Sequence, residues 1–283
     1  MKTIFFDNQM FIYAFEKGTA DALNLIINRL TSGKYRLVAS LETLIEFSQS
    51  EKLEHAQTLS QAIERFNPAW IQDFVTIQSS EVQNYIAMQF EGWHKSTINP
   101  TTNDFRSLFD SNYTDISPQA FIVATNAKVE RDANMIAHQR HSNILATLRD
   151  AEHSNLFTEE MNKAALQSII QDRLIRSEFR DKLSAEDIQH FTEYCIKNKN
   201  RFFKACPSMN AERWLTKYRA SNHKRVPRKS DSKDLTISIA AFPYVSVFCT
   251  ADKFLSDGLR YVRKHTKSIE TEVLEWPKLN KNQ

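Results

Sequence analysis

The stretch from residue 234 to residue 252 constrains the fold of this chain more than any other part of the sequence. It reads DLTISIAAFPYVSVFCTAD and has an acid at each end, Asp234 and Asp252. The aromatic and β-branched run at 244–249 favours a buried strand, and the residues before it favour a short apolar helix. Acids that follow parallel strands gather at one edge of a sheet, where ligands usually bind. The stretch therefore predicts an α/β fold with further acids placed after strands.

The N-terminal region supplies two such acids. Its expected elements are strands at 3–6, 35–39 and 74–77 and helices at 20–30, 41–48 and 54–65. Asp7 ends the first strand, and Ser40 is expected to cap the helix that follows the second strand. That helix carries Glu46 and, one turn earlier on the same face, the alternative candidate Glu42.

Between residues 80 and 222 the alternation of strands and helices stops, and only helical patterns occur. The expected helices lie at 80–93, opened by a Ser-x-x-Gln box, and at 118–153, 158–183, 184–200, opened by a Ser-x-x-Asp box, and 211–220. After the strand at 244–249, the pattern predicts a helix at 252–263 and a strand at 272–276. We therefore expect an α/β fold. It is a three-layer α/β/α domain with a central, mainly parallel sheet, formed by residues 1–78 and 231–283, with an all-α insertion at 79–230.

The composition excludes several classes of protein. Three cysteines without C-x-x-C spacing indicate neither a disulfide framework nor a cysteine zinc site. Asp7 interrupts the first apolar run too early for a signal peptide, and no stretch has the length of a transmembrane helix. We therefore expect a cytoplasmic protein. Its formal net charge of +3 permits a nucleic-acid partner without requiring one.

Four acids are candidates for one site: Asp7 after the first strand, Glu46 on the helix after the second strand, Asp234 at the start of a helix, and Asp252 after the penultimate strand. Converging carboxylates repel one another, so such a group is costly unless hard cations bind it. Oxygen ligands with open coordination positions suit Mg²⁺ or Mn²⁺, and such ions activate water and stabilise charge on phosphoryl groups. Each acid also has an ordinary explanation. Asp234 and Asp252 can complement helix N-termini, Asp7 can belong to a turn, and Glu46 can be a solvated helix residue.

These residues resemble the PIN domain, a family of metal-dependent nucleases. Three segments carry the resemblance. They are the strand followed by Asp7, the motif SLETLIE from Ser40 to Glu46, and the run from Asp234 to Phe254. It implies that the four acids form the catalytic, metal-binding cluster for Mg²⁺ or Mn²⁺. It covers the two α/β segments only, which make up under half of the chain.

The resemblance also implies two auxiliary residues and one departure. Thr250, two residues before the last acid, fits the family pattern. Family members usually carry Ser or Thr after the first Asp, whereas this chain has Asn8, whose amide still donates and accepts hydrogen bonds. Asp231 and Asp257 are further candidate ligands, although a loop acid and a solvated helix acid are the simpler interpretations.

A basic run precedes Asp234 and contains no acid. Its cationic residues, which we expect to contact RNA, are Lys217, Arg219, Lys224, Arg225, Arg228 and Lys229. The alternative is a solvated loop. His138 and His141 lie one turn apart on an expected helix, where a surface pair is the simpler interpretation than a second site.

The resemblance implies a metal-dependent endoribonuclease that hydrolyses RNA phosphodiester bonds, of the kind found in toxins and defence enzymes. A restraining or regulatory protein partner and a homo-oligomer are compatible with it. The sequence leaves two alternatives: an inactive PIN-like scaffold that binds RNA or protein, and a structure-specific DNA nuclease. No G-x-S-x-G, Walker loop or H-E-x-x-H motif supports another hydrolytic mechanism.

Overall fold

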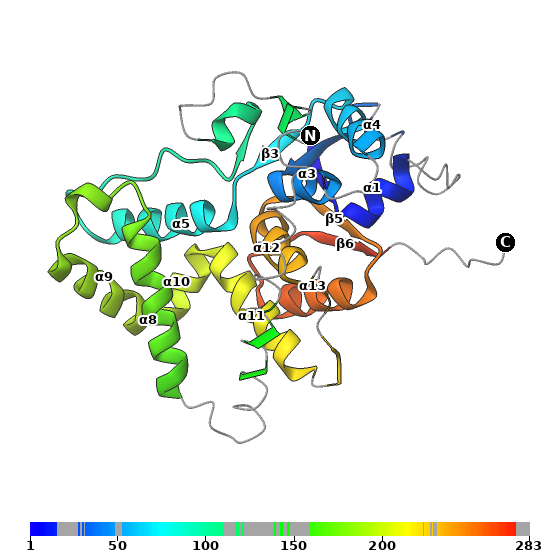
Figure 1. Ribbon diagram of the computed structural model, residues 1–283. Coiled ribbons are helices and arrows are strands. Elements are labelled where there is room, and N and C mark those ends of the chain that lie inside the picture. The colour runs from blue at the N-terminus through cyan, green and yellow to red at the C-terminus, as the bar shows by residue number, and fades with distance from the viewer. Residues whose placement is uncertain are drawn as a thin grey trace.

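A six-stranded sheet forms the centre of the computed structural model (Figure 1). The structure describes residues 1–15, 28, 30, 32–48, 53–109, 117–118, 120–121, 139, 142–143, 146–147, 159–222, 224–226, 228 and 231–275. The strands are β1 (Lys2–Phe6), β2 (Tyr35–Ser40), β3 (Ala69–Ile71), β4 (Thr101–Thr102), β5 (Val247–Thr250) and β6 (Glu272–Glu275). Their order is β4-β3-β2-β1-β5-β6, and every neighbouring pair is parallel except β3 and β4. The prediction of an α/β fold with a mainly parallel sheet is confirmed.

Strand β1 lies in the middle of the sheet, between β2 and β5, and its last three side chains are apolar. Ile4, Phe5 and Phe6 are buried, which matches the uninterrupted apolar run expected of a strand covered on both faces. In the register between β1 and β5, Phe6 lies opposite Cys249. This pairing brings the residues just after β1 next to those just after β5, although the two segments are far apart in the sequence.

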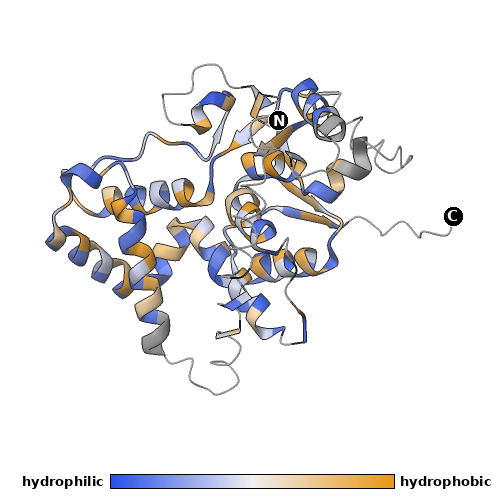
Figure 2. Cartoon of the chain, in the orientation of Figure 1, coloured by the Kyte–Doolittle hydropathy of each residue, from blue (hydrophilic) through white to orange (hydrophobic). Residues whose placement is uncertain are grey.

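Helices cover both faces of the sheet, an arrangement compatible with three layers. On one face the core includes residues from α1 (Asn8–Phe15), α3 (Leu41–Ser48) and α4 (Leu53–Arg65). On the other face it includes residues from α11 (Pro207–Ser221), α12 (Asp231–Ala241) and α13 (Lys253–His265), with the 3₁₀ turn Phe242–Tyr244. Figure 2 shows hydrophobic residues concentrated in the sheet and on the helix faces turned toward it.

A separate helical region has a hydrophobic core of its own. It is built from α5 (Phe74–Gln89), α8 (Glu159–Ile175), α9 (Ala185–Lys197) and α10 (Lys199–Ala205), and it lies beside the sheet in Figure 1. Two 3₁₀ turns, Phe105–Leu108 and Arg180–Lys182, complete the elements. Helix α9 begins with the expected box, in which Ser184 and Asp187 each accept from the other's backbone N–H.

The strand predicted at 74–77 is wrong, because these residues form the first turn of α5. Asp73 caps that helix and accepts from the backbone N–H groups of Val75 and Thr76 at 2.9 and 3.1 Å. Cap chemistry therefore outweighs the β-branched pattern. The third strand is β3, a few residues earlier, and the helix expected to begin at residue 80 begins at Phe74.

Several other expectations need correction or lie outside the described residues. Helix α11 lies within the expected insertion, yet Ala211 and Leu215 are buried in the core of the sheet. Strand β4 also falls in the region expected to be purely helical. Most of the helices expected at 20–30 and 118–153, together with His138 and His141, lie outside the described residues. No described helix combines the length and the apolar character that crossing a membrane requires.

Candidate active site

Asp7 stands directly after β1 at the carboxyl edge of the sheet, and three groups hold its side chain. Its Oδ1 accepts from the backbone N–H of Met10 at 2.8 Å, so Asp7 also caps α1. Its Oδ2 accepts from the Thr250 hydroxyl and from the backbone N–H of Ala251, the latter at 3.2 Å. Burial nevertheless raises the pKa of Asp7 to about 6, and the nearby charge of Asp252 adds to the rise. The hydrogen bonds fix both oxygens in place without neutralising the charge.

Asp252 follows β5 and caps α13. Its Oδ1 accepts from the backbone N–H of Leu255 at 3.0 Å, and its own backbone N–H donates to the Thr250 hydroxyl oxygen at 3.0 Å. The fully buried Thr250 therefore joins the two acids, since its hydroxyl donates to Asp7 and accepts from Asp252. The hydrogen bond from Leu255 to Oδ1 is the ordinary helix-cap role expected of Asp252. The other oxygen, Oδ2, lies 3.8 Å from Nη1 of Arg228.

Glu46 lies on α3, and Ser40 caps that helix by accepting from the backbone N–H of Thr43 at 3.1 Å. Burial raises the pKa of Glu46 well above its usual value, and the charges of Asp234 and Asp7 raise it further, while Lys233 lowers it. Burial also raises the pKa of Glu42, and the charge of Asp73 raises it further, while a hydrogen bond with Ser40 and the charge of Lys233 lower it. Glu46 is therefore the α3 acid that interacts directly with Asp234 and Asp7, and the charge of Glu42 also acts on Glu46.

Asp234 lies in the first turn of α12, where its carboxylate also complements the helix N-terminus. Electrostatic interactions connect it to Glu46, Glu46 to Asp7, and Asp7 to Asp252. These pairwise interactions link the four sequence-predicted acids in a series. Lys233, which the sequence analysis did not consider, acts on both Glu42 and Glu46. Its position one residue before Asp234 is the signal that would have found it.

The donor set at this edge consists of carboxylates and one amide. Asn8 adds an oxygen, because its buried Oδ1 accepts no hydrogen bond in the structure. Oxygen donors of this kind suit Mg²⁺ or Mn²⁺. Within the described part of the chain, no three Asp, Glu, His or Cys side chains are already grouped closely enough to hold one ion.

The other two candidate ligands lie elsewhere. Asp231 is buried, 1% exposed, and both of its oxygens accept from Arg225, with Oδ2 also accepting from the backbone N–H of Arg228 at 2.9 Å. Arg219 is buried too, and its Nη1 donates to the backbone oxygen of Asp231 at 2.9 Å. Asp257 lies on the surface of α13 and pairs with Lys253 and Arg260.

The basic run therefore divides into two groups. Arg219 and Arg225 serve Asp231, and Arg225 also covers the ring of Phe254 at 3.9 Å, so the structure does not present this pair as an open surface. Lys217, Lys224 and Arg228 are exposed. Lys229 lies outside the described residues.

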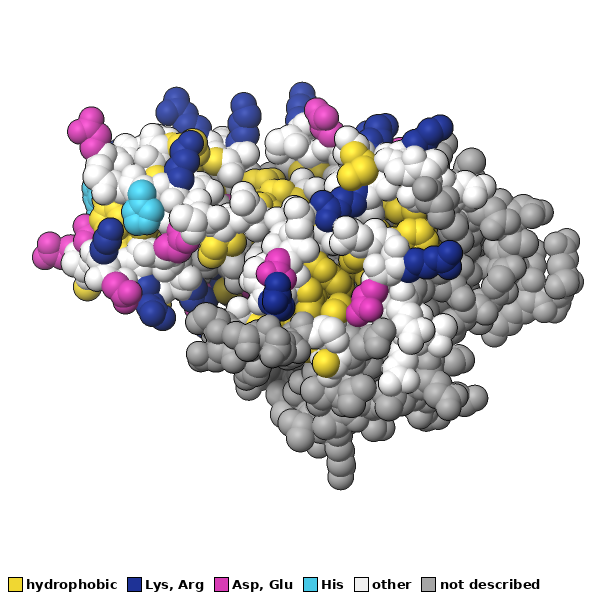
Figure 3. All heavy atoms as spheres, turned by 90° about the horizontal axis from the view of Figure 1, so that it is seen from above, with side chains coloured by type: hydrophobic (Ala, Val, Ile, Leu, Met, Phe, Trp, Pro, Cys, Tyr) yellow, Lys and Arg dark blue, Asp and Glu magenta, His cyan; other side chains and the backbone are white. Residues whose placement is uncertain are grey.

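Exposed cations occur widely on the molecule. Figure 3 shows Lys and Arg side chains projecting along one margin of the face seen from above.

No family model, curated protein or solved structure matches the chain.

Proposed function

We propose that the chain is a metal-dependent endoribonuclease with a PIN-like site formed by Asp7, Glu46, Asp234 and Asp252. The observation that supports the proposal is that Asp7 and Asp252 follow the neighbouring parallel strands β1 and β5, while the charges of Asp234 and Asp7 raise the pKa of Glu46. Their mutual repulsion gives the site a preference for divalent cations. Bound Mg²⁺ or Mn²⁺ would supply activation of water and stabilisation of phosphoryl charge.

The residues of the chain have distinct tasks in this proposal. Thr250 and the backbone N–H of Ala251 orient Asp7, while the caps of α1 and α13 orient Asp7 and Asp252. Arg228 is exposed beside Asp252, where a phosphate of the RNA backbone would add a partner for its charge. Lys217 and Lys224 extend the positive charge away from the acids.

The decisive experiment measures cleavage of a panel of RNAs in Mn²⁺ by the Asp234→Asn and Asp252→Asn chains. Both substitutions keep a side-chain oxygen for the helix N-terminus and remove one negative charge. The matched control is Asp257→Asn, because Asp257 lies on the surface of α13 and pairs with Lys253 and Arg260. We expect the first two to abolish cleavage and the control to retain it. Cleavage by all three chains at the original rate would reject the proposal.

A second candidate function is a scaffold that binds RNA or protein without cleaving it. The observation in its favour is that the hydrogen bonds of Asp7 and Asp252 are those of ordinary helix caps. Calorimetry with Mn²⁺ distinguishes the two, because the nuclease proposal requires ion binding that Glu46→Gln weakens. A parallel assay with single-stranded and branched DNA tests the remaining alternative, a DNA nuclease.

A further inference from the structure

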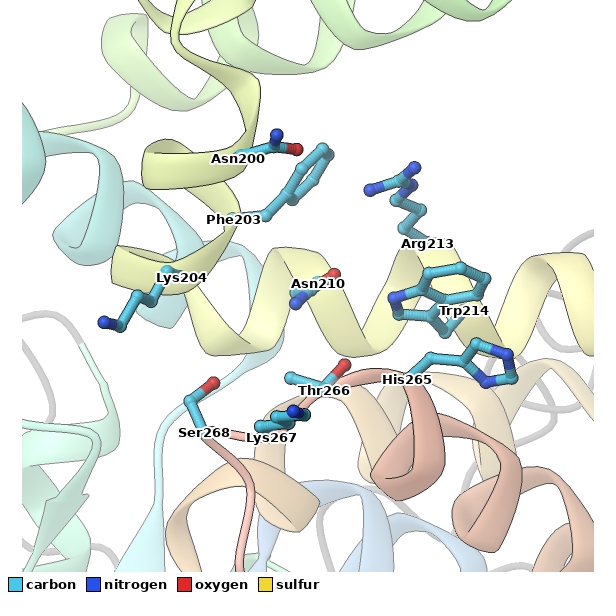
Figure 4. A pocket seen from close by; sticks show the side chains of 10 residues that line it. All are labelled: Asn200, Phe203, Lys204, Asn210, Arg213, Trp214, His265, Thr266, Lys267 and Ser268. Carbon is cyan, nitrogen blue, oxygen red and sulfur yellow. The ribbon is translucent and has the colours of Figure 1, made fainter.

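A cavity of about 600 Å³ lies where the helical region meets the C-terminal end of α13, away from the four acids. Figure 4 shows side chains from α10, from α11 and from residues 265–268 directed around it. The lining residues are Asn200, Phe203, Lys204, Asn210, Arg213, Trp214, His265, Thr266, Lys267 and Ser268. Its volume lies in the range of about 300–1,000 Å³ that is typical of small-molecule sites.

The charge of the lining has one sign. Lys204, Arg213 and Lys267 are cationic, and none of the ten lining residues is acidic. Aromatic rings hold one of these cations in place, since the Arg213 guanidinium lies 4.7 Å from the centre of the Phe203 ring and 5.0 Å from that of Trp214. Three cations without an internal carboxylate partner favour an anionic ligand such as a phosphate.

Two buried polar atoms in the lining have no hydrogen-bond partner in the structure. They are Oδ1 of Asn210 and Oγ1 of Thr266, whose residues are 8% and 3% exposed. An unpaired buried polar atom costs free energy, and a ligand that forms a hydrogen bond with it would remove that cost. The amide oxygen of Asn210 only accepts, and an anion without N–H or O–H groups would leave it unpaired. The ligand must therefore carry hydrogen-bond donors as well as negative charge.

The aromatic wall of the cavity is fixed as well. His265 stacks on Trp214 with ring centres 4.4 Å apart, and its Nδ1 donates to the backbone oxygen of Tyr261 at 2.8 Å. Because a carbonyl oxygen only accepts, this hydrogen bond fixes which nitrogen carries the proton and leaves Nε2 as the second polar atom of the ring. A rigid aromatic wall beside cations and amides suits a ligand with a ring, a hydroxyl-bearing sugar and a phosphate.

We propose that this cavity binds a nucleoside phosphate, with Lys204, Arg213 and Lys267 holding the phosphate and with Asn210 and Thr266 pairing to hydroxyl or amino groups. The ligand is either a free nucleotide or the phosphorylated end of an RNA strand, which share this chemistry. The proposal does not depend on the nuclease assignment, because the cavity shares no residue with the carboxylate site.

The test is calorimetry on the full chain in excess EDTA, which keeps divalent ions away from the carboxylate site. The probes are adenosine 5′-monophosphate, adenosine, inorganic phosphate and a 5′-phosphorylated tetranucleotide of RNA. We expect the monophosphate to bind at least about tenfold more tightly than either adenosine or phosphate alone. Equal affinity for phosphate and the monophosphate, or no binding of either phosphorylated nucleotide probe, would overturn the proposal.

Two substitutions place the binding in the cavity. Lys267→Glu should weaken monophosphate binding by about tenfold, whereas Lys163→Glu, a matched change of an exposed lysine on α8, should change it less than about twofold. Thr266→Val removes an unpaired hydroxyl at nearly constant volume, so it should weaken binding without lowering the melting temperature. Equal losses with Lys267→Glu and Lys163→Glu would show attraction by general charge and would reject the cavity as the site.

The tetranucleotide identifies the source of the ligand. If it binds more tightly than the monophosphate, the cavity holds the end of an RNA strand. If it binds less tightly, the cavity takes free nucleotides. In both cases loss of binding must follow Lys267→Glu, and binding that survives this substitution contradicts the assignment.

Discussion

Asp231 and Asp7 both lie at the start of a helix, yet their surroundings shift the pKa of the two carboxyl groups in opposite directions. Burial opposes the charge of Asp231, but hydrogen bonds from Arg225 and from the Arg228 backbone, with the charge of Arg219, hold the pKa of this carboxyl below its usual range. Burial raises the pKa of Asp7, whose partners are a hydroxyl and backbone N–H groups. Asp231 is paired with arginines of the chain, whereas the groups that donate to the Asp7 carboxylate are neutral.

The difference separates structural acids from candidate ligands. Asp231 and Asp234 are one turn apart on α12, so position on the helix does not distinguish them. What distinguishes Asp231 is that two arginines enclose it. An acid that an arginine encloses has its charge satisfied, and acids that mainly face other acids gain most from a metal ion.

Removing the carboxylate of Asp231 should have the largest effect on folding. Asp231→Ala leaves the buried Arg219 and the half-buried Arg225 without their carboxylate partner, which we expect to cost about 3–5 kcal/mol of unfolding free energy. Urea denaturation followed by circular dichroism measures this. Asp257→Ala, which removes a surface acid, should cost less than about 0.5 kcal/mol. Similar losses in both chains would show that Asp231 is not special.

Glu81 extends the comparison to a buried acid that has donors but no cation. Its oxygens accept from the backbone N–H groups of Ser208 and Met209 and from the Tyr244 hydroxyl, yet burial raises its pKa to about 7 from a usual value of 4.5. The pKa of Glu81 is higher in the folded chain than in the unfolded chain, so protonated Glu81 stabilises the folded state. This contribution to the unfolding free energy is fully present below pH 4.5 and is lost as the pH rises through 7.

Glu81→Gln should remove this pH dependence. A difference of two to three pKa units corresponds to about 3 kcal/mol of unfolding free energy between pH 4.5 and pH 7. Denaturation of both chains at a series of pH values measures the slope. If the substituted chain loses as much stability as the original over this range, another group is responsible.

Glu46 tests the opposite side of the comparison, where removal of a charge should harm activity and not folding. Glu46→Gln should lower RNA cleavage by at least about 100-fold, because even loss of an outer partner of a metal ligand costs up to that factor. The melting temperature at pH 8 should stay constant or rise, because burial and the repulsion from Asp234 and Asp7 disfavour the charged form. A fall in both activity and melting temperature would place Glu46 with Asp231 as a structural acid.

The smallest expected effect concerns the exposed cation beside Asp252. Arg228→Ala should leave stability within about 0.5 kcal/mol of the original, because its side chain is 72% exposed. We expect it to weaken RNA binding by a few fold and to reduce the slope of log affinity against log salt by about 0.7. Arg225→Ala should show the reverse, with a clear loss of stability. Identical behaviour of the two chains would contradict the division of the basic run.

The sequence predicted the sheet better than the surroundings of the acids. Strands near 3–6, 35–39, 244–249 and 272–276 were predicted from their aromatic, β-branched and other apolar residues, and β1, β2, β5 and β6 lie at or near these positions, although β5 begins only at Val247. The segment at 74–77 failed because a β-branched pattern over four residues also fits the buried face of a helix. The Asp73 cap decides between the two.

The candidate acids could be placed from sequence, but their partners could not. Which strands are neighbours fixes which acids meet, and Asp7 and Thr250 come together only through the pairing of β1 with β5. The enclosure of Asp231 by Arg219 and Arg225 depends on how α11 packs against α12, which no local pattern encodes. Lys217 and Arg219 look alike in the sequence and differ in the structure because α11 turns one face toward the sheet, so Arg219 is buried and Lys217 is exposed.

The central position of β1 determines when, during synthesis of the chain, the candidate site can form. Its neighbour β5 is synthesised some 240 residues later, and the Thr250 hydroxyl that orients Asp7 comes from a residue 243 positions away. While the ribosome is still translating the chain, β1 therefore lacks one of its two neighbours and Asp7 lacks a donor. Contacts between such distant segments form late in folding. Under the proposed function, we expect a nascent or truncated chain that lacks β5 to be inactive.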